Sequence, residues 1–402
     1  GGNITANGGV GNSNYGGGGA GGRIALYFTD SDYSGLVRTL GGAGYVRLNL
    51  GRFDSSSGSV YANGFNPASF RVSTGSATGV GGISFVAEGD ARARTGTWSA
   101  HNLTILGSLS GRTLNFSMTN DLTINSGASI SVTQRGNRGG SPGAAGAGTG
   151  GGAGSSASTG TRGAGGGGHG GRGSNGVNAS GGVMHGSITS PNAYGGGGGG
   201  ANTTSTTNGY GSATYGGASA GYINLNVAGR TRVNGTIVAD GASGEISSNT
   251  YGKSYGGGGA GGSIRIITGV LDGSGNLTAN GGAGHSSIGG GGSGGRIAIT
   301  YTTASYTGIL YAKGNTTSYT ISSSSYNAED GSVYINGTND ANFLVGSAII
   351  DAQNSSIELV GTVVARDINV QARNFTIPTG TSVSVTGRGY NGGGGGSTGA
   401  GP

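Results

Sequence analysis

The sequence contains no cysteine. Disulfide bonds, thiolate zinc sites and thiol nucleophiles are therefore excluded together. A protein without these cross-links has to take its stability from packing and backbone hydrogen bonds, and repetition of one structural unit is a common way to achieve this. The absence of cysteine does not by itself fix the compartment in which the protein works.

Charged side chains are also scarce, at 9% of the 402 residues, against a usual share of about 25%. The 21 basic residues only modestly outnumber the 15 acidic ones, and they are scattered without a basic run. This pattern argues against nucleic-acid binding. Two neutral, polar surfaces can approach with little Coulomb penalty, so we expect a surface that tolerates close packing and assembly.

Long apolar runs are missing as well, and no stretch approaches the roughly 18 residues that a membrane-spanning helix needs. Apolar residues make up only 33% of the chain, so a large spherical core is hard to build. No window shows the helical period, and glycine costs about 1 kcal/mol per residue in a helix. We therefore expect almost no helix and no insertion into a membrane.

Glycine, by contrast, occupies 100 positions, and much of it lies in a long internal repeat. The segment NITANGGVGNSNYGGGGAGGRIALYF, which begins at Asn3, returns as NLTANGGAGHSSIGGGGSGGRIAITY from Asn276, and GSVYANG at Gly58 returns at the same offset as GSVYING at Gly331. The offset between the copies then becomes about twenty residues shorter: NDLTINSGASISVTQRG at Asn120 corresponds to RNFTIPTGTSVSVTGRG at Arg373. The loss of about twenty residues is close to one coil of a parallel β-solenoid, which can drop a coil while its neighbours restack.

The two copies divide the chain unequally, because the first begins near Gly1 and the second stops early. We interpret the chain as one full repeat plus part of the next: a slice of a longer array, or a subunit whose ends are completed by neighbours. The missing initiator Met predicts a mature or excised product. The expected segments are a first β-repeat copy at 1–127, a glycine-rich region at 128–218, a β segment with a glycine tract at 219–275, a second copy at 276–390 and the start of another glycine-rich region at 391–402.

Between the glycine tracts the sequence forms short runs with period-two alternation, such as RIALYF, SISVTQ and SIRIIT, bounded by NG, DG, SG and TG pairs. This pattern is typical of β-strands. The comparable segments NLTI, DLTI, NFTI and INVQ carry Asn or Asp that could stack at the turns of successive coils. The predicted fold is all-β, with parallel β-solenoid or β-helix-like repeats and interleaved polyglycine tracts; tandem β-sandwich domains are the alternative.

The glycine tracts share a motif, in which Tyr or Ile precedes the glycines and an Ile-bearing strand follows them. We expect tracts that pack as extended helices through backbone hydrogen bonds. Flexible linkers are the alternative, above all for Gly139–Gly182, where no strand interrupts. The residues that mark the motif, and that we predict to be structural, are Tyr15, Arg23, Ile24, Tyr215, Ile223, Tyr255, Ile264, Ile288, Arg296 and Ile297.

Arg23 and Arg296 close equivalent tracts. One hypothesis is that each guanidinium donates hydrogen bonds to tract carbonyls, and the other is that each is a ligand-binding cation. Ser263 and Tyr222 fill the same slot in other tracts. The structural role is therefore favoured.

The combination of T-A-N-G-G, GGGG[AS]GGRIA and repetition resembles the glycine-rich repeats of very large secreted and cell-surface proteins. This resemblance implies a β-solenoid-like fold and an adhesive or structural role. The tract Gly139–Gly200 also looks like the polyglycine-helix tips of certain phage tail-fibre adhesins.

Signatures of catalysis are weak. His101, His169, His185 and His285 show no metal-ligand spacing, so we expect four polar surface histidines. The acidic pairs Asp30 with Asp32, Glu88 with Asp90, and Glu329 with Asp330 are the candidates for the chemistry of a polysaccharide-cleaving β-helix enzyme. The repeat replaces Asp30 and Asp32 by Thr303 and Ser305, which argues against an enzyme; no cofactor or metal site is expected.

These observations predict a structural subunit or segment of a self-assembling filament or fibre, extracellular or at the cell surface, whose partners are copies of itself. The alternative is an adhesin or receptor-binding module that recognises glycans or cell envelopes through glycine-rich loops.

Overall fold

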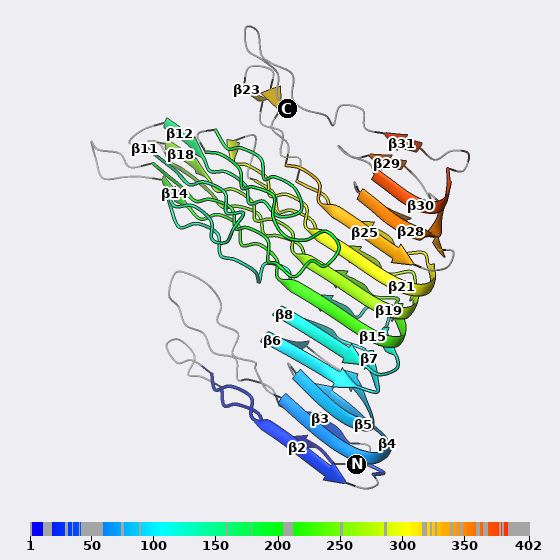
Figure 1. Ribbon diagram of the computed structural model, residues 1–402. Helices are drawn as coiled ribbons and strands as arrows, with labels where there is room; N and C mark the ends of the chain where they lie inside the picture. The colour runs from blue at the N-terminus through cyan, green and yellow to red at the C-terminus, as the bar shows by residue number, and fades with distance from the viewer. Residues whose placement is uncertain are drawn as a thin grey trace. The chain divides into compact units, whose positions relative to one another are not determined.

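The structure is a computed structural model (Figure 1). It describes residues 2–10, 18–28, 31–33, 35–39, 41, 59–73, 76–87, 90–157, 160–177, 179–203, 212–249, 252–284, 288–315, 320–321, 324–325, 328–337, 341–342, 344–345, 349–358, 362–364, 369–377, 379 and 382–384.

The chain is all-β, with 48% of its residues in strands. No α-helix occurs in the ranges just given. The predictions of an all-β fold and of almost no helix are confirmed for these residues. Most ladders are parallel, whereas β-sandwiches are built from antiparallel sheets, and the parallel strands form a six-stranded barrel with additional strands.

The chain folds into two compact units, each drawn from separate segments. Unit 1 comprises residues 1–131, 224–237 and 266–275, and unit 2 comprises residues 132–223, 238–265 and 276–402. The five linear segments expected from composition stay a prediction.

Unit 1 contains a stack of parallel strands. They are β1 (Ile4–Thr5), β2 (Arg23–Phe28), β3 (Leu36–Arg38), β4 (Ser59–Ser73), β5 (Ser76–Ala87), β6 (Asp90–Ala100), β7 (Asn102–Ile105), β8 (Ser108–Met118), β9 (Leu122–Ile124) and β10 (Ser129–Ser131). Three further strands have residues in both units: β15 (Tyr222–Val233), β16 (Thr236–Val238) and β19 (Ser263–Gly273).

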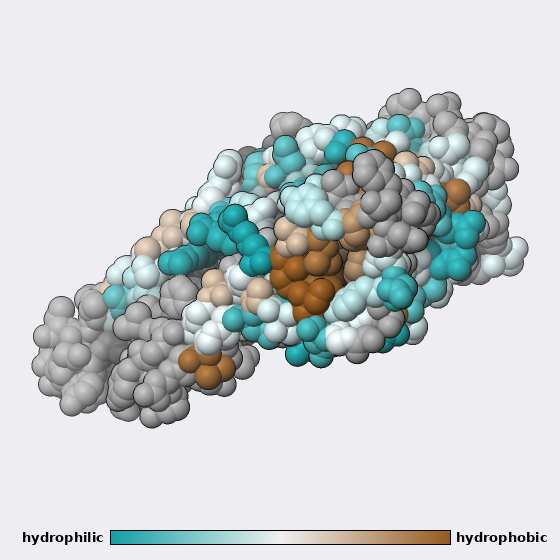
Figure 2. All heavy atoms as spheres, turned by 90° about the horizontal axis from the view of Figure 1, so that it is seen from below, coloured by the Kyte–Doolittle hydropathy of each residue, from teal (hydrophilic) through white to brown (hydrophobic). Residues whose placement is uncertain are grey.

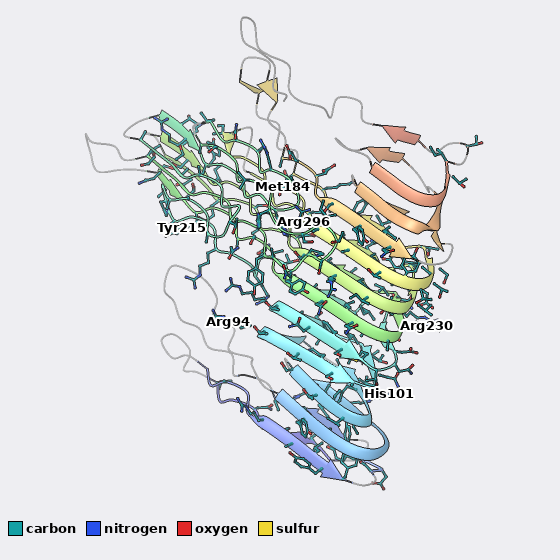
Figure 3. The ribbon with its side chains drawn as sticks, viewed as in Figure 1. Arg94, His101, Met184, Tyr215, Arg230 and Arg296 are labelled. Carbon is teal, nitrogen blue, oxygen red and sulfur yellow. The ribbon has the colours of Figure 1, made fainter. Side chains whose placement is uncertain are left out.

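The predicted stacking of NLTI on DLTI is present in unit 1. Strand β7 pairs in parallel with β9, and Leu103 lies opposite Leu122. At the turn before these strands, the Asn120 side chain donates to Oδ1 of Asn102 at 2.9 Å, and Asn102 in turn donates to Ser84 Oγ at 3.1 Å. The amide ladder satisfies polar groups that successive turns bring together. Figure 3 shows His101 and Arg230 at the same edge of the unit, with Arg94 at the opposite edge.

The core of unit 1 follows from the alternation along each strand. Phe85, Leu103, Phe116 and Leu122 are at most 1% exposed, as is Trp98, while their neighbours in sequence face outward. Because each inward side chain lies above its counterpart on the next strand, the core is a narrow column rather than a sphere, which suits the low apolar content.

Unit 2 contains shorter strands and the long glycine-rich segments. Its strands are β11 (Ser155–Ala157), β12 (Gly160–Gly163), β13 (Ala201–Thr203), β14 (Ser212–Thr214), β17 (Ile246–Asn249), β18 (Gly252–Tyr255), β20 (Asn276–Thr278), β21 (Arg296–Tyr306), β22 (Ile309–Tyr311), β23 (Thr320–Ile321), β24 (Ser324–Ser325), β25 (Ser332–Gly337), β26 (Ala341–Asn342), β27 (Leu344–Val345), β28 (Ile349–Glu358), β29 (Thr362–Val364), β30 (Asn369–Thr376) and β31 (Ser382–Ser384). In Figure 1 the glycine segments run between the short strands near β11, β14 and β18 at one end and β21 and β25 at the other.

The sequence repeat is also a structural repeat. We call residues 3–38 the first-copy module and residues 276–311 the second-copy module. Strand β2 pairs with β4 as β21 pairs with β25, with Arg23 opposite Ser59 and Arg296 opposite Ser332. Equivalent backbone bonds also recur, as the next two pairs show. The bond from Gly19 N to Gly9 O in the first-copy module corresponds to the bond from Gly292 N to Gly282 O in the second. The bond from Ala6 N to Arg38 O likewise corresponds to the bond from Ala279 N to Tyr311 O.

Candidate functional site: a hydrogen-bonded glycine array

The glycine tracts connect short strands to long ones. Tyr255 ends β18, the tract Gly256–Gly262 follows, and β19 begins at Ser263. The tract before β15 likewise runs from Tyr215 to Gly221, and β15 begins at Tyr222. Each tract therefore crosses unit 2 as an extended segment, entered from a tyrosine and left through a strand with a buried isoleucine.

The tracts bond to one another in a three-residue rhythm. In the tract 256–262, donors three residues apart bond the same neighbouring segment: residues 257 and 260 bond one segment, residues 258 and 261 a second, and residues 259 and 262 a third. The bonds are Gly257 N to Gly199 O, Ala260 N to Gly196 O, Gly258 N to Gly290 O, Gly261 N to Ser293 O, Gly259 N to Ala242 O and Gly262 N to Ala239 O, at 2.8–3.0 Å.

The tract 195–200 shows the same rhythm with different neighbours. Its bonds are Gly196 N to Gly168 O, Gly199 N to Gly165 O, Gly197 N to Ala147 O, Gly200 N to Ala144 O and Gly198 N to Gly217 O, at 2.9–3.0 Å. Three residues per turn is the period of an extended helix of the polyproline II type. We define the glycine array as the segments 136–153, 163–177, 179–182, 195–200, 216–221, 239–244, 256–262, 279–284 and 288–295 that these bonds and their equivalents join.

Only glycine fits at the crossing points of this array. A Cβ at Gly198 would fall on the carbonyl oxygen of Gly257, and one at Gly261 on the carbonyl oxygen of Ala279. The tracts 195–200 and 256–262 are buried throughout. The interior therefore consists of backbone, and its stabilisation comes from hydrogen bonds worth about 0.5–1.5 kcal/mol each, set against the high ordering entropy of glycine.

The stretch Gly139–Gly182 belongs to this array, so the linker hypothesis is wrong for its described part. Gly152 donates to Gly197 O at 2.9 Å, Gly168 to Gly150 O at 2.7 Å and Gly182 to Gly166 O at 2.8 Å. Two short strands, β11 (Ser155–Ala157) and β12 (Gly160–Gly163), lie within this stretch, so the expectation that no strand interrupts it is also wrong; the glycine segments around them bond to other glycine tracts. Composition alone cannot distinguish such a packed tract from a flexible one.

A buried polar cluster lies within the array around His169. Its side chain is fully buried: Nδ1 is 2.9 Å from the carbonyl oxygen of Gly261, and the backbone N–H donates to Ser293 Oγ at 2.9 Å. The ring of His185 lies 4.9 Å away, measured between centroids. The prediction of a surface histidine is wrong for His169; the missed signal is its place inside GGGGHGG, a tract that packs.

Arg296 completes this cluster. It is 2% exposed, and its guanidinium donates to the carbonyl oxygens of His185 (3.0 Å) and His169 (3.4 Å) and to Ser332 Oγ (2.9 Å). Arg296 thus bonds the carbonyl of His169, inside a glycine segment, and that of His185, just beyond its end, which agrees with the structural hypothesis. Figure 3 places it beside Met184, with Tyr215 toward the other end of the tracts.

Burial sets the protonation of the cluster. Desolvation, followed by the nearby His185 and Arg296, lowers the pKa of His169 to about 3, so this ring is neutral at physiological pH. Desolvation also lowers the pKa of Arg296 to about 10, which leaves it a cation. A neutral His169 whose Nδ1–H donates to the Gly261 carbonyl fits a structural role for the pair.

The other predicted motif residues occupy contrasting environments. Ile223, Ile264 and Ile297 are fully buried, Ile24 is 9% exposed and Tyr255 is 6% exposed. Tyr215 and Ile288 are half-buried, whereas Arg23 is exposed. Tyr15 lies outside the described residues.

The candidate acids and remaining histidines that the structure describes lie in separate places. Glu329 Oε2 accepts from the backbone N–H of Arg172 at 3.0 Å, and Asp330 Oδ1 from that of Gly314 at 2.8 Å, so both side chains bond turns. Asp32 is exposed, and His101 and His185 are half-buried. Asp30, Glu88 and His285 lie outside the described residues, as does the side chain of Asp90.

Within the described part of the chain, no group of three or more His, Cys, Asp or Glu side chains could hold a metal ion. No helix there is long and apolar enough to cross a membrane. No protein-family model, curated protein or solved structure matches the chain.

Proposed function

We propose that this chain is a structural subunit or segment of a self-assembling extracellular filament or surface fibre. The observation that carries the proposal is the glycine array, in which tracts bond tracts on several sides with almost no side chains between them. Such an interior gains stability without disulfides or a large apolar core. It suits an elongated structural protein better than an enzyme, which needs a pocket with placed reactive groups.

A parallel β-solenoid is the architecture that we propose for the strands. The parallel registers, the asparagine ladder and the recurrence of the module at Asn3 and Asn276 support stacked coils. Stacked repeats present the same surface at each end, so association with further copies is a natural consequence.

Electron microscopy of the purified chain over a range of concentrations tests this function. We expect regular fibres with an axial repeat of subunit size. Particles that stay monomeric at high concentration, together with saturable glycan binding, would refute the filament hypothesis.

An adhesin that binds glycans or cell envelopes is the second candidate. It is favoured by the loop at Val183 and Met184, whose side chains are 59% and 54% exposed beside the array. Exposed apolar residues can contact the apolar faces of sugars or another surface. Under this alternative, glycan-array binding would be lost in a Val183→Ser, Met184→Ser double variant that keeps the wild-type melting temperature.

A further inference from the structure

Two tyrosines lie side by side on the outer surface of unit 1. Tyr27 on β2 and Tyr61 on β4 have ring centroids 5.6 Å apart, and their ring planes are inclined by 50°. Tyr27 is 74% exposed, and Tyr61 is half-buried. By contrast, the rings of Phe85 and Phe116 in the apolar column are 1% exposed. The tyrosine pair therefore lies outside the core, where solvent reaches it.

The strand register brings the two rings together. Tyr61 lies opposite Ala25 in the parallel ladder of β2 and β4. Tyr27 follows Ala25 by two positions, so both tyrosines project from the same face of the sheet as diagonal neighbours. Diagonal positions on adjacent strands are within reach of aromatic side chains.

This outward face stays accessible where a strand has neighbours on both sides. Strand β4 lies between β2 and β5, and Tyr61 is still only half-buried. In the second-copy module Thr300 is the counterpart of Tyr27; its strand β21 pairs with both β19 and β25, and Thr300 is also half-buried. Figure 2, seen from the side on which Figure 1 places β2, shows hydrophilic and weakly polar residues around an apolar area. A dissolved oxidant can therefore approach the outer face of the pair.

Adjacent, accessible phenols are substrates for oxidative coupling. A one-electron oxidant removes one electron and the hydroxyl proton from each tyrosine, which leaves two phenoxyl radicals. The radicals form a carbon–carbon bond between the ring positions next to the hydroxyl groups, and the two displaced ring protons move to the phenoxyl oxygens. When hydrogen peroxide is the oxidant, the two electrons and two protons reduce it to two molecules of water.

We propose that Tyr27 and Tyr61 are an oxidative cross-linking site, which a peroxidase-type enzyme with hydrogen peroxide converts into a dityrosine within one chain. The reacting ring positions meet by rotation about χ1 and χ2, for which the exposed Tyr27 has room. Because the sheet holds both rings together, coupling within the pair outcompetes coupling between separate molecules. Tyr306, which is 0% exposed, is inaccessible to such an enzyme.

The cross-link would tie β2 covalently to β4 in a chain that contains no cysteine. Like a disulfide, it would close a loop, restrict the unfolded chain and so stabilise the fold. The site goes beyond the proposed fibre function and does not depend on it, because both rings belong to one chain.

The test treats the purified full chain with a haem peroxidase and limiting hydrogen peroxide. Dityrosine fluorescence should appear, and trypsin should release peptide 24–38 joined to peptide 53–71 with the loss of two hydrogen atoms. In an equal mixture of isotope-labelled and unlabelled chains, each linked product should be entirely labelled or entirely unlabelled. The oxidised chain should also melt at a higher temperature than the oxidised variant Tyr27→Phe.

Tyr27→Phe and Tyr61→Phe each keep the ring but remove the phenol, so each should abolish the linked peptide. The matched control is Tyr33→Phe, because Tyr33 belongs to the same tryptic peptide as Tyr27 while its ring lies 6.1 Å from that of Phe70. This control should retain the link.

The second copy of the repeat offers a gain-of-function variant. It has Tyr334 at the position of Tyr61 but Thr300 at the position of Tyr27. Thr300→Tyr places a second phenol diagonal to Tyr334 and should create a new link between peptides 297–313 and 314–366.

Absence of the linked peptide 24–38/53–71, an equal yield of it from Tyr27→Phe, or products that combine labelled and unlabelled peptides would refute the site. Absence of the new link in Thr300→Tyr would contradict the role of strand register in positioning the rings. Equal melting temperatures of oxidised wild type and oxidised Tyr27→Phe would refute the stabilising effect. Fibres without the cross-link would leave the proposed function standing, and the cross-link without fibres would leave only the site.

Discussion

Replacement of Gly198 by alanine tests whether the array is a packed element. Gly198 lies in the centre of a buried tract, donates to Gly217 O at 2.9 Å and accepts from Gly140 N at 2.8 Å. The new Cβ would fall on the carbonyl oxygen of Gly257. The tracts must separate to make room, and both hydrogen bonds are weakened.

The magnitude follows from three contributions. Overpacking costs about 1–3 kcal/mol, and two backbone bonds are worth about 0.5–1.5 kcal/mol each. Alanine also lowers the conformational entropy of the unfolded chain, which stabilises the folded state by about 0.4–1 kcal/mol. We therefore expect Gly198→Ala to destabilise unit 2 by about 1–6 kcal/mol.

Hydrogen exchange detected by mass spectrometry is the assay, because it reports on the tract itself. Exchange at residues 195–200 and 256–262 should accelerate, together with a lower melting temperature. The control is Gly9→Ala, where no atom lies within 4 Å of an added Cβ. If Gly198→Ala exchanges and melts like Gly9→Ala, the backbone-packed array is refuted.

Three further predictions concern side chains. Arg296→Ala removes the donors to two carbonyl oxygens and should lower the free energy of unfolding by about 3 kcal/mol. Arg23 is the exposed counterpart, and Arg23→Ala should lower it by less than about 0.5 kcal/mol. Equal melting temperatures for the two variants would contradict the structural role of the Arg296 cluster. The pKa of His169 is lowered from 6.5 to about 3, so its contribution to stability is fully present above pH 6.5 and falls with pH toward 3. At pH 4.5 the loss should be about 3 kcal/mol relative to pH 7, and a pH-stability profile identical to that of His169→Gln would overturn this assignment. Asp272 Oδ1 forms an ion pair with Arg232 Nε at 3.0 Å, and the Arg232 side chain is 43% exposed. Asp272→Asn should therefore lower the free energy of unfolding by less than about 1 kcal/mol. Thermal melts in 0.5 M salt should show no difference between this variant and the wild type.

Much of the fold could be predicted because its signals are local or repeated. Period-two runs indicate strands, and the recurrence of NLTI and DLTI predicts that Leu103 and Leu122 share a register. Near-identical segments at Asn3 and Asn276 build near-identical modules, because the same local interactions are available to both. The motif that leads from Tyr255 through glycine to Ile264 likewise marks a tract that enters a strand.

The tertiary structure alone decided which glycines pack and which polar side chains are buried. Gly139–Gly182 is low-complexity sequence, and its order depends on carbonyl and N–H groups from tracts that are distant in the chain. His169 and Arg296 are buried because those tracts surround them, whereas Arg23, in the same local motif, is exposed. Backbone hydrogen bonds between tracts carry no side-chain signature, so the sequence by itself determined the strands, the tracts and their repetition, while only the assembled array decided their partners and their burial.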